Sequence, residues 1–148
     1  DWSESRGLGD VYKRQGQIKG SKPSLFLIYP EGNFIEATED TPFFQIGEIK
    51  YGRPILIRAY RRELSMKDIF KLLIVSFDST LKANLTVGFP LDFQIYFTDT
   101  LKSGVEGRLN ANDPYFVDVS NAWSRGLEDL LLKLPSLTLS EEETKQKE

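Results

Sequence analysis

The sequence YPEGNFIEATEDTPFFQIGEIKYGRPIL, residues 29–56, contains the change from an extended to a helical pattern on which the fold assignment rests. Just before it, Ser24–Tyr29 is a short run of apolar, branched and aromatic side chains, which is typical of a buried strand. Turn residues follow at Pro30–Asn33, and Phe34–Thr38 is predicted as the returning strand. Residues 24–38 are therefore predicted to form a β-hairpin.

The second half of this stretch leads from the hairpin into a helix. Thr41–Ile46 is predicted as a third extended segment, and Gly47 ends it. From Glu48 to Tyr60 the apolar residues recur near one face of a helix. Pro54 fits such a helix only in its first turn or at a kink, because proline has no amide hydrogen to donate.

The clearest helical pattern lies in the middle of the chain. Ser65 is a good N-cap, and Asp68 follows it at the spacing of a capping box. The helix is predicted to end near Asn84. Its apolar residues extend around most of its circumference, which indicates a helix buried between a sheet and another helix.

Two further strands and a last helix complete the pattern. Leu91–Thr98 is predicted as a strand and Val105–Leu109 as a weaker one. Asp113 and Pro114 are a typical N-cap and first residue of a helix, which Pro135 stops. Strands, helices, strands and a helix in this order favour an α+β fold, with an antiparallel sheet and helices packed on it.

Composition excludes several classes of function. The 148-residue chain has a formal net charge of -3, which does not favour nucleic-acid binding. It contains no Cys and no His, so a disulfide, a thiolate nucleophile, a Cys/His zinc site and a Ser-His-Asp triad are all excluded within it. No cofactor and no metal are expected. No apolar run approaches the roughly 20 residues of a membrane span, and no signal peptide is visible, so we expect a cytoplasmic protein without a membrane partner.

The first fifteen residues, DWSESRGLGDVYKRQ, lack a hydrophobic period. Residues 5–15 match the in-frame translation of a common transposon-type sequencing adaptor. We therefore expect residues 1–15 to be an adaptor-derived artefact without regular structure, and the natural reading frame to begin upstream of Gly16. The globular part is expected to span residues 16–139, followed by a polar tail at 140–148.

Taken alone, the residues provide few candidates for chemistry. Glu36, Glu39 and Asp40 are more typical of solvated charges at the end of a hairpin than of a carboxylate site. Ser79 and Thr80 lie on the long helix without an adjacent base. The glycines are isolated and do not form a phosphate-binding loop. The residues by themselves thus predict only a soluble α+β domain.

Three blocks of sequence add a resemblance. They are residues 26–56, residues 72–97 and residues 112–123, the last reading NDPYFVDVSNAW. All three are similar to bacterial proteasome-type peptidases of the Anbu ("ancestral beta subunit") group. The resemblance implies the C-terminal half of an N-terminal-nucleophile hydrolase sandwich, in which two antiparallel sheets lie between two helix layers.

The resemblance also implies amide hydrolysis by a processed N-terminal Thr, whose hydroxyl attacks while its α-amine accepts the proton. That Thr and its assisting Asp and Lys are expected upstream, so no catalytic residue is assigned here and the chain itself is predicted to be inactive. Glu48, Asn84 and Thr86 are candidates for residues that hold the catalytic groups in position without reacting themselves. Helix-cap and turn chemistry is an equally natural interpretation of each.

Three functions remain open from the sequence. The first is a threonine peptidase subunit that assembles into a homo-oligomeric ring or open ring and acts on peptides or proteins. The second is a non-catalytic structural subunit of the same fold. The third is an amidohydrolase for a small peptide-like substrate, because one fold can serve several chemistries.

Overall fold

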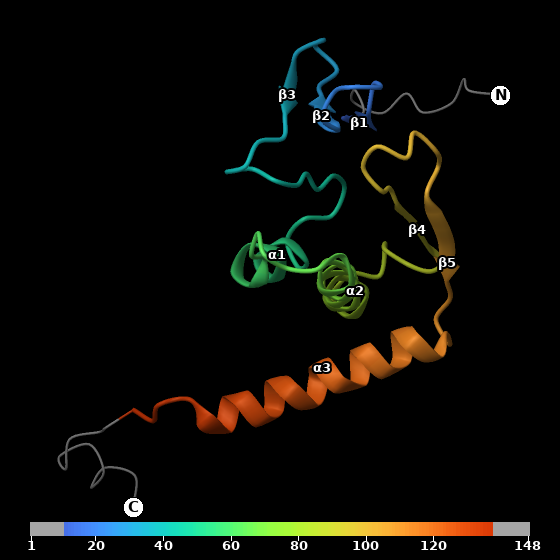
Figure 1. The fold of residues 1–148 in the computed structure, drawn as a ribbon. Coiled ribbons are helices and arrows are strands. Elements are labelled where there is room, and N and C mark those ends of the chain that lie inside the picture. Colours follow the sequence, from blue (N-terminus) through green and yellow to red (C-terminus); the bar gives the residue numbers. More distant parts are fainter. Residues whose placement is uncertain (1–10, 138–148) are drawn as a thin grey trace, which may run out of the picture.

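The computed structural model describes residues 11–137 (Figure 1). Within them lie two antiparallel sheets and three helices, which confirms the α+β class. The elements in chain order are β1 (Tyr12–Gly16), β2 (Ser24–Ile28), β3 (Phe34–Glu36), α1 (Arg53–Ala59), α2 (Met66–Ala83), β4 (Leu91–Ile95), β5 (Val105–Leu109) and α3 (Pro114–Lys133).

The predicted hairpin is present as β2 and β3. The two strands pair antiparallel, with Phe26 opposite Glu36. The turn is closed by two backbone hydrogen bonds: the Tyr29 amide donates to the Asn33 carbonyl at 2.9 Å, and the Gly32 amide donates to the Tyr29 carbonyl at 3.0 Å. Gly32 has a φ of +88°, a conformation that glycine adopts readily.

The structure differs from the sequence expectation at the start of the chain. Tyr12–Gln15, expected to lack regular structure, belong to β1, which pairs with the other edge of β2. An antiparallel ladder is made by backbone groups, so a strand can pair there without a hydrophobic pattern of its own. All five β1 residues are exposed, which is why the sequence carried no signal. Residues 1–10 and 138–148 lie outside the described part, and the adaptor origin stays a prediction.

The segment between the hairpin and α1 is a second difference. Residues 41–46 form no strand, and the helix expected from Glu48 starts only at Arg53, with Pro54 in its first turn. Gly47, at a φ of +77°, and the turn at residues 50–52 delay the helix. Gly52 lies against α2: an added Cβ would come 2.9 Å from the Ser76 carbonyl oxygen.

Helix α2 is the central element of the described chain. As predicted, the Ser65 side chain caps it by accepting a hydrogen bond from the Asp68 amide, and it ends at Asn84. Its buried face carries Ile74, which forms the core cluster with Leu109 and Phe116. The helix is less covered than predicted, because Leu73 and Phe77, which lie next to this buried face, remain about two-fifths exposed.

The second sheet and the last helix enclose the other side of α2. β4 and β5 pair antiparallel, β4 ending at Ile95 rather than at the predicted Thr98. In Figure 1 α3 lies beyond α2, on the side away from β1–β3, and runs on past it. Asp113 caps α3 by accepting a hydrogen bond from the Tyr115 amide, and the helix ends just before Pro135, as expected. None of the helices in residues 11–137 is long and apolar enough to span a bilayer.

Candidate functional site

The three residues singled out from the sequence form one hydrogen-bonded chain. The Asn84 side-chain amide donates to Glu48 Oε2 at 2.8 Å. Asn84 Oδ1 in turn accepts from the Thr86 amide at 2.9 Å and from the Thr86 hydroxyl at 2.7 Å. We call this group the Glu48–Asn84–Thr86 network. It joins the loop before α1 to the loop after α2.

Glu48 and Asn84 owe their positions to the local backbone. Glu48 follows Gly47, whose positive φ turns the chain back, and its Oε1 accepts the Lys50 amide at 2.7 Å. Asn84 is the C-cap of α2, where its own amide still bonds the Thr80 carbonyl at 2.9 Å while its backbone has become extended. The network therefore links the residue at which α2 ends to the loop just before α1.

A cavity of 260 Å³ lies beside the network, between residues 43–48 and the surface of α2. Apolar side chains predominate in its wall, with a few polar ones among them. The lining residues are Lys13, Phe43, Phe44, Gln45, Ile46, Glu48, Leu56, Leu73, Ser76, Phe77, Thr80 and Val87.

Gln45 is a site residue that the sequence did not indicate. Its Nε2 donates to the Glu48 carbonyl oxygen at 3.0 Å, so it holds the backbone of the loop that carries the carboxylate. Its Oε1 is buried and has no hydrogen-bond partner within residues 11–137. A glutamine in an irregular loop carries no periodic signal, and only the folded loop shows where its side chain lies.

No protein-family model and no curated protein matches the chain. Solved structures do. The Gly-1 mutant of Anbu from Hyphomicrobium sp. strain MC1 is 54% identical, with a TM-score of 0.81. Anbu from Yersinia bercovieri is 46% identical, with a TM-score of 0.80. A helical assembly of the Anbu complex from Pseudomonas aeruginosa is 47% identical, with a TM-score of 0.79.

The chain belongs to the Anbu family.

Each of these matches covers 84% of the chain, which confirms the resemblance stated from the three sequence blocks. The chain spans about half the length of the same relatives: 54% of the Hyphomicrobium protein, 53% of the Yersinia protein and 52% of the Pseudomonas protein. Its α+β fold is that of the matched part of an Anbu subunit.

The residues of this network can hold other groups in position, but they include no activated nucleophile. The Thr86 hydroxyl donates its hydrogen to Asn84 Oδ1, and Glu48 accepts at both carboxylate oxygens. A nucleophile needs an adjacent base to take its proton, and the network places none beside Thr86. Within residues 11–137, no group of three His, Cys, Asp or Glu side chains is placed to hold a metal ion.

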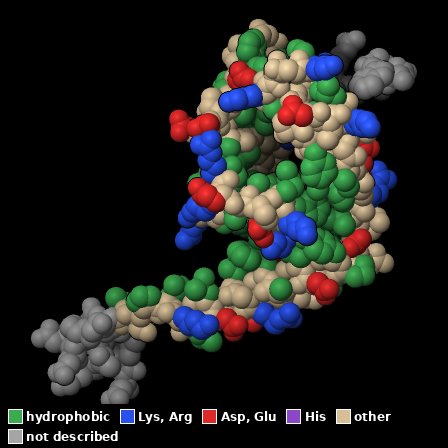
Figure 2. All heavy atoms as spheres, in the orientation of Figure 1, with side chains coloured by type: hydrophobic (Ala, Val, Ile, Leu, Met, Phe, Trp, Pro, Cys, Tyr) green, Lys and Arg blue, Asp and Glu red, His purple; other side chains and the backbone are tan. Residues whose placement is uncertain are grey.

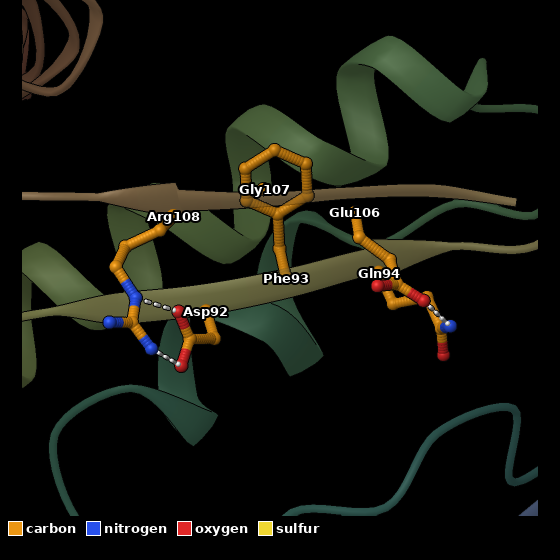
Figure 3. A pocket seen from close by; sticks show the side chains of 6 residues that line it. All are labelled: Asp92, Phe93, Gln94, Glu106, Gly107 and Arg108. Carbon is orange, nitrogen blue, oxygen red and sulfur yellow. Dashed lines mark hydrogen bonds and ion pairs between the residues drawn. The ribbon is translucent and has the colours of Figure 1, made fainter. Parts of the chain in front are cut away.

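A second hollow lies over β4 and β5, and Figure 3 shows its residues. Phe93 points to one side of the two strands, and two polar pairs, Asp92–Arg108 and Gln94–Glu106, point to the other. Arg108 Nη2 donates to Asp92 Oδ2 at 2.8 Å, and Gln94 Nε2 donates to Glu106 Oε1 at 2.7 Å. The Arg108 hydrogen bonds lower the pKa of the Asp92 carboxyl below its usual range. These side chains satisfy one another across the strands, as surface pairs of a sheet do.

Proposed function

We propose that this chain is part of a proteasome-type threonine peptidase subunit, which hydrolyses amide bonds with an N-terminal Thr that lies outside the chain. The observation that carries the proposal is the match to Anbu structures at up to 54% identity over 84% of the chain. The Glu48–Asn84–Thr86 network supports it, because the residues nominated from the resemblance are hydrogen-bonded to one another and one of them, Glu48, lines a cavity.

In the proposed reaction the Thr hydroxyl attacks the substrate carbonyl and the α-amine of the same residue takes its proton, so one residue supplies both nucleophile and base. A Lys and an Asp assist it by adjusting pKa values and position. The part played by this chain is support. Glu48, Asn84 and Thr86 fix two loops against each other, and rigid support of this kind keeps catalytic groups in productive geometry.

The proposal includes a homo-oligomeric assembly, a ring or an open ring, acting on peptides or proteins in the cytoplasm. The Pseudomonas relative is described as a helical assembly of the Anbu complex. A repeated contact between identical subunits generates a ring when the rotation closes and a helical filament when it does not. We assign this chain no cofactor, no nucleic acid and no membrane.

The decisive test begins with the coding sequence. The reading frame upstream of the Gly16 codon should start with Met followed by Thr and should contain a Lys further along. The protein made from it should hydrolyse fluorogenic peptides, and replacement of the N-terminal Thr by Ala should abolish turnover. Glu48→Gln should lower kcat with little change in KM, because it weakens support for the catalytic groups and leaves the substrate contacts in place.

Two alternatives remain, and the same protein separates them. A non-catalytic structural subunit would assemble but lack the upstream Thr and show no turnover of any peptide. An amidohydrolase for a small peptide-like substrate would cleave di- or tripeptide amides and leave longer peptides intact. Cleavage of a panel of increasing length, followed by mass spectrometry, distinguishes the three.

A further inference from the structure

Lys82, in the last turn of α2, joins that helix to α3. Its ammonium group donates to Asp78 Oδ2 at 2.9 Å, to Ser120 Oγ at 3.0 Å and to Ser124 Oγ at 3.3 Å. A lysine ammonium has three hydrogens, so these acceptors use its whole capacity. The Asp78 side chain is buried, and the Ser124 hydroxyl itself donates to the Ser120 carbonyl at 3.0 Å. Both helices are thus fixed to one cation.

This polar contact complements the apolar core. Ile74 of α2 packs with Leu109 of β5 and Phe116 of α3, and Figure 2 shows hydrophobic side chains gathered between α2 and the β4–β5 sheet. Lys82 lies about two turns further along α2 than Ile74. The core therefore holds the middle of the helix, and the Lys82 contact holds its C-terminal end.

The candidate site begins on the other side of the same helix end. The Asn84 amide still donates to the Thr80 carbonyl at 2.9 Å, so the last turn of α2 sets the direction of the Asn84 side chain. Residues two apart on a helix point about 200° away from each other. Asn84 accordingly reaches Glu48, while Lys82 reaches α3. A rotation of this last turn would move Asn84 relative to Glu48.

We propose that Lys82 is a positioning residue for the Glu48–Asn84–Thr86 network; the inference rests on the proposed function, in which that network supports the catalytic groups. Helix ends fray readily, because their last carbonyls have no partner within the helix. By holding the last turn of α2 to α3, Lys82 keeps the Asn84 side chain within hydrogen-bond distance of Glu48. Its effect passes through the helix backbone.

The two serines of α3 permit a test that leaves the ion pair of α2 in place. Lys82→Met would leave a buried carboxylate without its cation and would weaken the whole fold. The double variant Ser120→Ala, Ser124→Ala removes only the hydroxyls that bind the ammonium, and alanine keeps α3 helical. The matched control is Asn121→Ala, Arg125→Ala, because these two residues have the same spacing on α3 and are exposed.

Hydrogen exchange of this chain, followed by NMR, reports on the network. The Thr86 amide donates to Asn84 Oδ1 at 2.9 Å, and it should exchange at least about fivefold faster in the serine variant, as expected from the loss of about one hydrogen bond. The Ile74 amide, in the middle of α2, should change less, and the control variant should change neither amide. Wild-type exchange of the Thr86 amide in the serine variant, or acceleration of both amides by the same factor, would overturn the proposal.

The protein made from the upstream reading frame tests the consequence for catalysis. In that protein the serine variant should lower kcat about fivefold with little change in KM, because it disturbs the support of the catalytic groups and not the substrate contacts. A kcat equal to that of the wild type would overturn the link from Lys82 to catalysis. A wild-type protein without turnover would instead refute the proposed hydrolysis, and the exchange rates would still decide whether Lys82 positions the network.

Discussion

The Asn84 side chain donates a 2.8 Å hydrogen bond to Glu48, a residue 36 positions earlier in the chain. This bond connects the end of α2 with the loop that precedes α1. Asn84 also accepts two hydrogen bonds from Thr86, so a single side chain orders both its own loop and a distant one. It is the junction of the candidate site.

Asn84→Ala should therefore lower the free energy of unfolding by about 0.5–1.5 kcal/mol, because it removes the hydrogen bonds that join the two loops. Urea denaturation followed by circular dichroism measures this. Asn121→Ala, at an exposed position of α3, should change stability by less than about 0.5 kcal/mol. The double variant Glu48→Ala, Asn84→Ala should lose less stability than the sum of the losses in the two single variants. A strictly additive loss would contradict a direct coupling of the two side chains.

The contact of Gly52 with α2 leads to a second prediction. In Gly52→Ala the new Cβ would overlap the Ser76 hydroxyl and lie 3.0 Å from Thr80 Oγ1, which should cost about 1–3 kcal/mol of stability. Gly126→Ala is the control, because its Cβ would meet no atom within 4 Å and alanine favours a helix by about 1 kcal/mol. The melting temperature should thus fall in Gly52→Ala and rise in Gly126→Ala. A loss of stability in both variants would refute the packing argument.

Lys82 and Asp78 form an ion pair of 2.9 Å in which the aspartate side chain is only 4% exposed. Lys82→Met should destabilise the fold by about 3 kcal/mol, since it leaves a buried carboxylate without its cation. Lys67→Met, on the exposed side of the first turn of α2, should change stability by less than about 0.5 kcal/mol. Equal midpoints of the two variants in urea would show that the pair does not stabilise the fold.

Asp68 should give the fold a measurable dependence on pH. Hydrogen bonds from Lys71 and Ser65 hold the pKa of its carboxyl below the ordinary value of 3.8. A lowered pKa in the folded state means that the carboxylate stabilises the fold above the ordinary value and that this stabilisation is lost as pH falls through the lowered pKa.

Asp68→Asn should accordingly lower the urea midpoint at neutral pH, and its difference from the wild type should shrink as the pH falls from about 5 to below 3. Lys71→Met should show the same convergence, because it removes the main cause of the shift. A difference that grows on acidification would have the wrong sign for this mechanism.

Local patterns predicted the parts of the fold that depend on neighbours in sequence. The hairpin followed from the turn residues at 30–33, and the caps at Ser65 and Asp113 marked the starts of α2 and α3. β1 was not predicted, because its residues are exposed and its pairing uses backbone groups alone. The delayed start of α1 was also missed, since the turn at residues 50–52 depends on contacts with α2 and not on periodicity.

In the candidate site, too, some residues could be predicted from the sequence and others were visible only in the folded chain. Glu48, Asn84 and Thr86 were named through the family resemblance, while Gln45 and the links among all four came only from the folded chain. By itself, the sequence determined the family, the α+β class and the helix caps. The caps and the fold class depend on local residue patterns, and the family is visible in the similarity of long stretches of sequence. The tertiary structure alone decided which polar atoms meet and which leucines stay uncovered, because such contacts join residues far apart in the chain and depend on how the helices pack.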